Sequence, residues 1–432
     1  MLTSSRQARD LLSRISDLVA SRPRAAAQPA PAPAPSPADA LLNRRLEDSL
    51  SIPVRNPQGG TDGTKAQDRG QFLARQERWE ELSRQIRKAD DARTAARCGL
   101  PVADLLAYGA RADVVNATEH ALAVEEGAGS RTLIRGLMAF EALRAEHRND
   151  PYLTALVALA HIDIGWAWRG PGNKPGSSPS GAEARQRRCA AHFDRAAALL
   201  EPLAEDSQDS PFLRAAQCAL FAGRPGGTLR VADEFGALID LAPGNHRHMR
   251  TLGTHMLPRW SGSYAALELE ARRTASRTES TWGAGGYTWV YFDAITLDGQ
   301  ACARVDTRFF LDGLKDIVQA NPSQEMINLL AAYCTVALRK ELGQNLQADV
   351  PRLKIAEAAD WLIRDHLKEL HPLVWAHAAE GFDNSARITS LSRFAARGHT
   401  GALQAIAGQF RDEIEGGQKV AFTAEGLQFS PA

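Results

Sequence analysis

The chain has 432 residues, of which 44% are hydrophobic and 24% charged, so it can bury a large core. Basic and acidic residues each number 51, and the zero formal net charge gives no overall field to attract nucleic acid. No apolar run approaches the roughly 20 residues of a transmembrane helix. The five cysteines lack a C-x-x-C pair, which favours buried thiols in a reducing compartment. We therefore expect a cytoplasmic protein without a nucleic-acid partner.

The N-terminal part is expected to carry a short amphipathic helix on a tether. Residues 1–22 place five apolar side chains on one helical face: Leu11, Leu12, Ile15, Leu18 and Val19. Residues 23–69 read as a disordered linker that is rich in Pro and Ala and then in Gly, with a short helix at 40–50 and a polar loop at 56–70. The amphipathic helix could dock on the chain itself or on a partner.

The remainder, 70–432, predicts an all-α domain, because apolar residues recur at helical spacing between Pro, Gly, Asn and Asp breaks. Four segments share the layout helix, polar break with Pro, helix: 138–162, 193–221, 232–257 and 309–338. The last residues, KVAFTAEGLQFSPA, favour a small β-hairpin around Ala424, Glu425 and Gly426.

These segments resemble degenerate tetratricopeptide repeats (TPR). The second-helix spacing of that family is met by Val231, Phe235, Leu238 and Pro243 and, with the aromatic residue one position early, by Ala190, Phe193, Ala197 and Pro202. Its first-helix spacing is met by Met249, Leu252, Gly253 and Met256, and by Ile327, Leu330, Ala331 and Cys334. LPRWSGSY at 257–264 is similar to an element of uncharacterised bacterial TPR-like proteins. The resemblance implies a solenoid of stacked helical hairpins that binds a protein or peptide in its groove, without catalytic residues.

Three histidines in NHRHMRTLGTHML raise the question of a metal site. On a helix, His248 and His255 are separated by about 10 Å of rise, and His246 points to the opposite side. One ion cannot bridge that gap at metal–nitrogen distances near 2 Å. We expect solvated or interface histidines there, and Met249, Leu252 and Met256 as a buried stripe with Gly253 allowing a neighbouring helix to approach.

A second histidine group comprises His366, His371 and His377, where Pro372 should end one helix and start another. The glycines of WGAGGYTWVYFD at 282–293 do not match a nucleotide-binding loop and more plausibly separate two helices. We expect no catalytic residues, no metal and no cofactor. A helical metal-dependent enzyme using either histidine group is the alternative.

Aromatic residues next to loops are the candidate partner-binding residues. Trp166, Trp168 and Arg169 end an apolar helix before a long Gly/Pro/Ser loop, and Trp and Arg are favoured interface anchors. Trp260 and Tyr264 flank a tight turn in which Ser263 is a plausible N-cap. The alternatives are core tryptophans beside an insertion, or a small-ligand sensor with a pocket at Trp166 and Trp168. The leading hypothesis is a non-catalytic scaffold or adaptor for protein–protein interaction.

Overall fold

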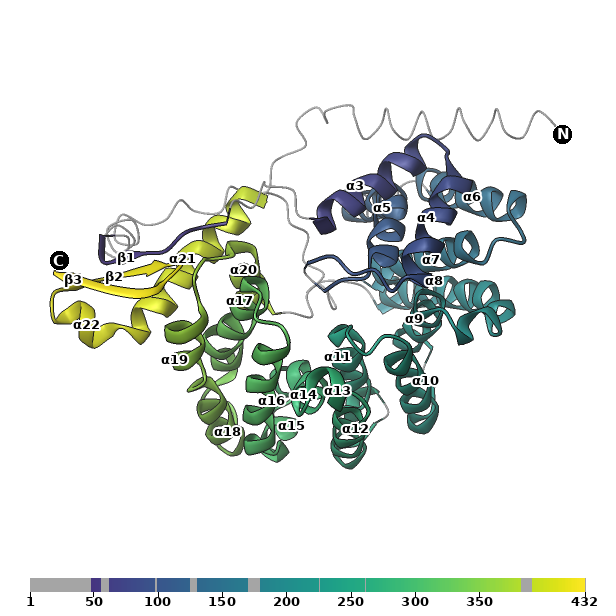
Figure 1. Cartoon of the computed structure of the whole chain (residues 1–432). Coiled ribbons are helices and arrows are strands. Elements are labelled where there is room, and N and C mark those ends of the chain that lie inside the picture. Colours follow the sequence, from purple (N-terminus) through teal and green to yellow (C-terminus); the bar gives the residue numbers. More distant parts are fainter. Residues whose placement is uncertain are drawn as a thin grey trace. The chain divides into compact units, whose positions relative to one another are not determined.

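The computed structural model describes residues 48–55, 62–97, 99–124, 130–169, 179–224, 226–260, 262–381 and 391–431. The expected helix at 1–22 and most of the tether lie outside these ranges. The described residues form two compact units, 62–245 and 48–55 with 246–431, and each is considered by itself. Both are built mainly from helices (Figure 1), which confirms the predicted helical class. Within the described ranges, no helix has the length and apolar character to cross a bilayer.

The first unit is a series of antiparallel helices around one apolar core. Its helices are α3 (Asp62–Arg75), α4 (Trp79–Asp91), α5 (Val102–Val124), α6 (Ser130–Glu146), α7 (Pro151–Arg169), α8 (Pro179–Leu200), η1 (Glu201–Leu203), η2 (Asp206–Gln208), α9 (Pro211–Ala219), η3 (Leu220–Ala222) and α10 (Thr228–Leu241). Helix α7 is buried on nearly every side from Tyr152 to Gly165. It is therefore the central helix of this unit.

The prediction of a loop at 56–70 is wrong from residue 62 onward, where α3 begins. The reason is close packing of α3 on α5, which overrides the low helix propensity of glycine. A β-carbon at Gly70 would lie 2.0 Å from the carbonyl oxygen of Leu106, and one at Gly109 would lie 1.9 Å from that of Gln67. The two glycines let the helix backbones touch, and that contact stabilises a helix that the sequence pattern does not predict.

A buried carboxylate joins three helices of the first unit. Asp90 at the end of α4 accepts a hydrogen bond from the Tyr152 hydroxyl of α7 at 3.1 Å and from the Phe212 amide of α9 at 3.0 Å. The Ser210 hydroxyl also donates to it, and Ser210 caps α9 by accepting from the Leu213 amide. Several donors satisfy this buried acid, as its removal from water requires.

The second unit contains the remaining helices and a small sheet. Its helices are α11 (His246–His255), η4 (Pro258–Trp260), α12 (Tyr264–Arg277), α13 (Glu279–Trp282), α14 (Gly285–Leu297), α15 (Gly299–Arg304), α16 (Thr307–Ala320), α17 (Gln324–Ala332), η5 (Tyr333–Ala337), η6 (Leu338–Glu341), α18 (Leu346–Ala356), α19 (Ala359–Trp361), η7 (Leu362–His366), α20 (Pro372–Glu380), α21 (Leu391–Gln409) and α22 (Arg411–Glu415). Helix α11 packs as the sequence predicts. The stripe of Met249, Leu252 and Met256 is buried. A β-carbon at Gly253 would lie 1.8 Å from the Val290 carbonyl oxygen of α14, which confirms the predicted close approach.

The sheet has three strands in the order β1 (Leu50–Ser51), β2 (Gln418–Thr423) and β3 (Gly426–Pro431) (Figure 1). Strands β2 and β3 form the predicted hairpin, in which Thr423 pairs with Gly426 across a two-residue turn. The expected helix at 40–50 is wrong at its end, because Leu50 lies in β1 and pairs in parallel with Val420. Burial of Leu50 and Val420 on one sheet face explains the extended conformation.

The four segments predicted as hairpins each contain two helices separated by a break. They correspond to α6 and α7, to α8 and α9, to α10 and α11, and to α16 and α17. The division between the two units falls between α10 and α11, at Asn245 and His246. Pairs of successive helices are thus observed, the third of them divided between the two units, while their arrangement as TPR hairpins and their stacking as a solenoid stay predictions.

Candidate functional site

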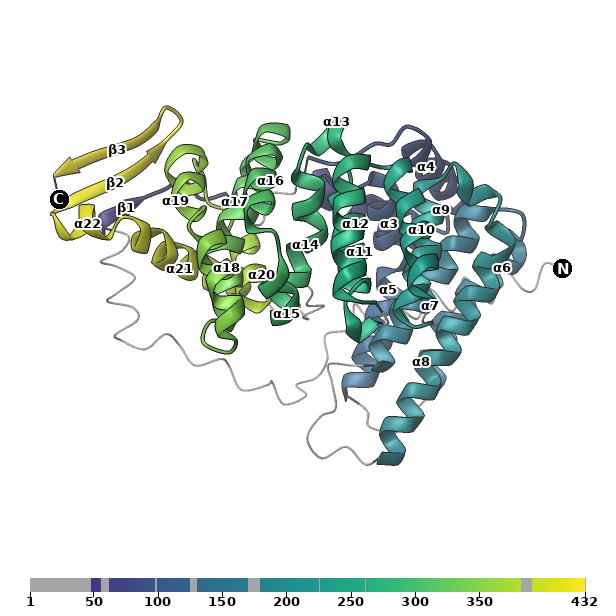
Figure 2. The ribbon, with the colours of Figure 1, turned by 90° about the horizontal axis from the view of Figure 1, so that it is seen from below.

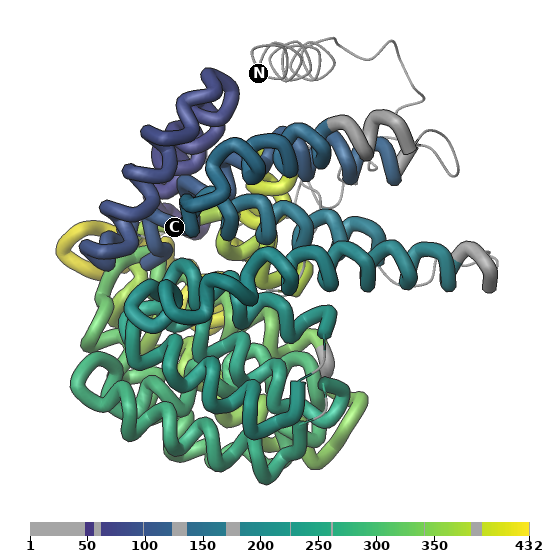
Figure 3. Tube along the Cα trace, turned by 90° about the vertical axis from the view of Figure 1, so that its right-hand side faces the viewer, coloured from purple at the N-terminus to yellow at the C-terminus, as the bar shows by residue number. Residues whose placement is uncertain are grey.

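Helices α7 and α8 lie side by side and antiparallel for most of their length (Figures 2 and 3). We call their facing residues, 161–169 of α7 and 188–193 of α8, the α7–α8 seam. Gly165 is at its centre, where a β-carbon would lie 3.0 Å from the Phe193 ring and 3.4 Å from the His192 β-carbon. The small residue lets the two helices approach closely, so the side chains along the seam are fixed against one another.

The seam carries two aromatic–arginine pairs at one end. Trp166 keeps 38% of its surface exposed, meets the edge of the Phe193 ring and has the Arg169 guanidinium 5.0 Å above its own ring. Trp168 is half-buried, with the Arg188 guanidinium 4.4 Å from its ring centroid. We call these four residues, Trp166, Trp168, Arg169 and Arg188, the Trp–Arg face. Of the three predicted α7 residues, the structure thus pairs Trp166 with Arg169, and it pairs Trp168 with Arg188 of α8, a residue that the sequence pattern does not indicate.

A hydrogen-bonded chain of two histidines and a glutamate lies further along the seam. The Nδ1 atoms of His161 and His192 are 3.0 Å apart, and His161 Nε2 is 3.1 Å from Glu141 Oε1 of α6. Arg195 binds both carboxylate oxygens of Glu141 at 2.7 Å. Because a carboxylate only accepts, His161 Nε2 donates to it and His161 Nδ1 accepts from His192 Nδ1. This order leaves His192 Nε2 without a proton in the neutral pair.

The surroundings keep both imidazoles neutral. Hydrogen bonds from Arg195, and secondarily from His161, hold the pKa of the Glu141 carboxyl below its usual value. Burial lowers the pKa of His161 despite the attraction of Glu141. Burial and the neighbouring His161 lower the pKa of His192 to about 4. No sequence pattern indicates this pair, because His161 stands in an apolar helix and its partner is brought near only by the packing of α8.

Cys189 is also on the seam, one helical turn before His192. It is a half-buried free thiol, and burial raises its pKa. A thiol with a raised pKa is a poor nucleophile at neutral pH. The seam therefore offers a contact surface rather than an activated cysteine.

The other two predicted partner-binding residues belong to the second unit. The half-buried Trp260 meets the ring of His255, with the centroids 5.6 Å apart. The Tyr264 hydroxyl donates to the Asp298 carboxylate, and Arg304 lies 4.7 Å from the Tyr264 ring. Ser263 caps α12 as predicted, by accepting from the Ala266 amide at 3.1 Å. Trp260 and Tyr264 thus have defined packing roles, and their partner-binding role stays a prediction.

The expectation of solvated histidines at 246–255 is wrong for two of the three. His246 and His255 are buried, and His246 stacks on Trp289 with ring centroids 4.2 Å apart. Burial lowers the pKa of His248 and of His255 to about 4 and holds that of His246 well below its usual value. The sequence reading failed because α11 is covered on more than one side, so positions off its apolar stripe are buried as well.

The second histidine group is spread over separate contacts. His366 meets the edge of Trp361, His377 that of Phe394, and His371 Nε2 lies 2.9 Å from Glu369 Oε1. Helix α20 begins at Pro372, which confirms the predicted break. The structure therefore gives each of these histidines a different neighbour. Among the described residues, no group of three or more metal-binding side chains is placed to hold an ion.

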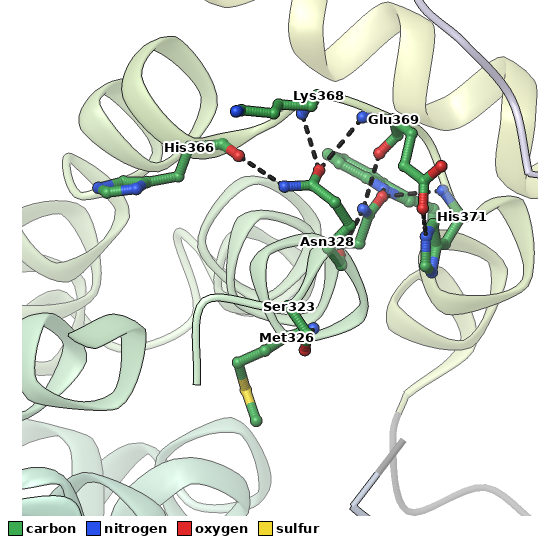
Figure 4. A network of polar contacts seen from close by, with 9 residues as sticks. Ser323, Met326, Asn328, His366, Lys368, Glu369 and His371 are labelled. Atoms are coloured by element: carbon green, nitrogen blue, oxygen red, sulfur yellow. Dashed lines mark hydrogen bonds and ion pairs between the residues drawn. The ribbon is translucent and has the colours of Figure 1, made fainter. Parts of the chain in front are cut away.

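Figure 4 shows what holds the segment 366–371 in place: the buried Asn328 of α17. Its amide nitrogen donates to the carbonyl oxygens of Gln324 and Glu369, and its oxygen accepts from the His371 amide and from the Trp375 ring nitrogen. One turn earlier, Gln324 binds the same segment through Lys368, Glu369 and His366. This network satisfies backbone groups and serves the fold rather than chemistry.

Comparison of the chain with protein families, with curated proteins and with solved structures gives no match. The functional argument therefore rests on the geometry of the two units.

Proposed function

We propose that the chain is a non-catalytic scaffold or adaptor that binds a partner peptide or helix, and that the Trp–Arg face is the binding site. The observation that carries this proposal is the exposed Trp166, which is held between Arg169 and Phe193. An aromatic side chain already ordered in the free protein loses little conformational entropy on binding, which is the usual property of an interface anchor.

We further propose that the helical hairpins stack in the TPR manner and that the protein works in the cytoplasm. The first idea is supported by the helices that succeed one another in the four segments and by Gly253, which stands at the first-helix spacing of the family and closely approaches the Val290 backbone. The second is supported by the cysteines: Cys189, Cys218, Cys302 and Cys334 are free thiols.

Replacement of the exposed tryptophan tests the binding site. Trp166→Ala is expected to weaken partner binding at least ~30-fold, the effect of losing one interface anchor. The measurement has two steps: cross-linking capture by the purified full chain in an extract of its source cells, then titration of the recovered partner. The matched control is Tyr108→Ala, since Tyr108 is 54% exposed on α5 and has Arg111 5.4 Å from its ring.

Two results would overturn the proposal. One is a partner that binds Trp166→Ala and the unaltered chain with equal affinity while its cross-links map away from the seam. The other is a purified chain that turns over a substrate.

Deletion of residues 1–40 is expected to leave the melting temperature nearly unchanged and to weaken partner binding. The described elements begin after this segment, so their contacts are retained. The apolar face of residues 1–22 would be lost as a recognition element. Calorimetry and the same titration check both parts. A collapse of the thermal transition would show that the segment belongs to the folded core.

A further inference from the structure

We propose that the His161–His192 pair is a pH-sensitive element that releases the Trp–Arg face in acid. This inference rests on the proposed function, because it names the regulation of the same site. It starts from the geometry of the pair, in which one proton lies between two Nδ1 atoms 3.0 Å apart.

The contact requires an unprotonated nitrogen. His161 Nδ1 can accept from His192 only through its lone pair, since its Nε2 proton is already directed at Glu141. A first added proton can be held by His192 Nε2. A second would occupy His161 Nδ1, so that two N–H groups would face each other across 3.0 Å. The doubly protonated pair therefore cannot keep this hydrogen bond.

The groups around the pair provide little compensation for added positive charge. Glu141 of α6 and Arg195 of α8 act directly on His161, and the carboxylates nearest to the pair in sequence are Asp163, two residues after His161, and Asp194, two residues after His192. Arg195 already binds both oxygens of Glu141, Arg111 of α5 binds Asp163 at 2.6 Å, and Arg224 lies 3.4 Å from Asp194. Each carboxylate thus has a permanent cation beside it before either histidine is charged.

The pair is connected to the Trp–Arg face through one helical turn. Gly165 stands one turn after His161 and faces both His192 and Phe193. Phe193 in turn meets the ring of Trp166. Separation of His161 from His192 therefore moves the surfaces against which Trp166 is held. In acid the face loses the order that prepares it for binding.

The direction of the pH effect follows from the neutral folded state. Well above pH 6.5 the histidines are neutral in both the closed and the open seam, and pH has no effect. As the pH falls from 6.5 toward 4, an open seam takes up protons that the closed seam does not, because the pKa of His192 in the closed seam is about 4. Closure is therefore progressively weakened as the pH falls through this window.

Hydrogen exchange on the full chain at pH 6.5 and 4.5, corrected for the intrinsic rate, tests this inference. In the unaltered chain, peptides covering 161–169 and 185–193 are expected to gain roughly tenfold in exchange at pH 4.5 relative to peptides 71–91 of the same unit. His192→Gln should reduce this gain, because a glutamine amide can donate to His161 but does not titrate, which leaves His161 as the one titrating group of the pair. His120→Gln, an exposed histidine on α5, is the matched control and should retain it.

The inference is overturned if, in the unaltered chain, hydrogen exchange at pH 4.5 rises no more in the seam peptides than in the reference peptides. This result needs no variant. A full gain in His192→Gln overturns it as well. The proposed function fails separately. Partner binding that depends on Trp166 but is equally tight at pH 6.5 and 4.5 contradicts only the switch. Suppose that hydrogen exchange of the seam rises in acid in a manner that depends on His192, while the partner binds away from the seam. That outcome contradicts only the proposed binding site.

Discussion

Asn328→Ala is expected to lower the free energy of unfolding of the second unit by roughly 3–5 kcal/mol, since each buried polar group left unpaired costs about 1–3 kcal/mol. Asn328 is fully buried and makes four hydrogen bonds. Alanine would leave the Glu369 carbonyl, the His371 amide and the Trp375 ring nitrogen without this partner. Denaturant unfolding with a probe in the second unit measures the loss.

The same substitution should loosen a distant part of the chain. The segment that Asn328 holds includes Leu370, whose amide donates to the Pro53 carbonyl at 2.8 Å and whose carbonyl accepts from the Arg55 amide at 2.9 Å. Faster hydrogen exchange at Arg55 is therefore expected. Asn321→Ala is the control, because Asn321 is half-buried and accepts one bond of 3.2 Å from the Ser323 amide. An Asn328→Ala loss no larger than this control would contradict the role of the network.

Gly253→Ala is expected to destabilise the second unit by about 3 kcal/mol or more, because overpacking against fixed backbone forces helices apart. The added β-carbon would lie 1.8 Å from the Val290 carbonyl oxygen, so α11 and α14 would have to separate. The paired ion contact between Arg250 and Asp293, at 2.6 and 2.9 Å, spans these helices and would be strained with them.

The matched control is Gly401→Ala, in the middle of α21, where an added β-carbon meets nothing within 4 Å. At this position alanine should raise the free energy of unfolding by about 0.5–1 kcal/mol, because alanine has a higher helix propensity than glycine. Thermal melts of both variants check the pair of predictions. The melting temperature is expected to fall in Gly253→Ala and to rise in Gly401→Ala. An unchanged melting temperature in Gly253→Ala would show that α11 and α14 can separate without loss of stability.

The sequence alone determined features that depend on neighbours along the chain. The hydroxyl cap of Ser263 at the start of a helix follows from the need to satisfy the first amides of that helix. Apolar spacing located α11 with its buried stripe and the contact at Gly253, and the short turn located β2 and β3. Such patterns act over one helical turn or one hairpin, so they can be read directly.

Only the tertiary structure decided which distant segments meet. Leu50 is extended because β2 is available to pair with it, and residues 62–70 are helical because α5 accepts the backbone of Gly70. His161 and His192 form a pair because the close approach at Gly165 aligns α7 with α8. His246 is buried under Trp289, although its position on the helix favours solvent. These outcomes depend on the surface that each element meets, and no local pattern contains the shape of a neighbour that lies far along the chain.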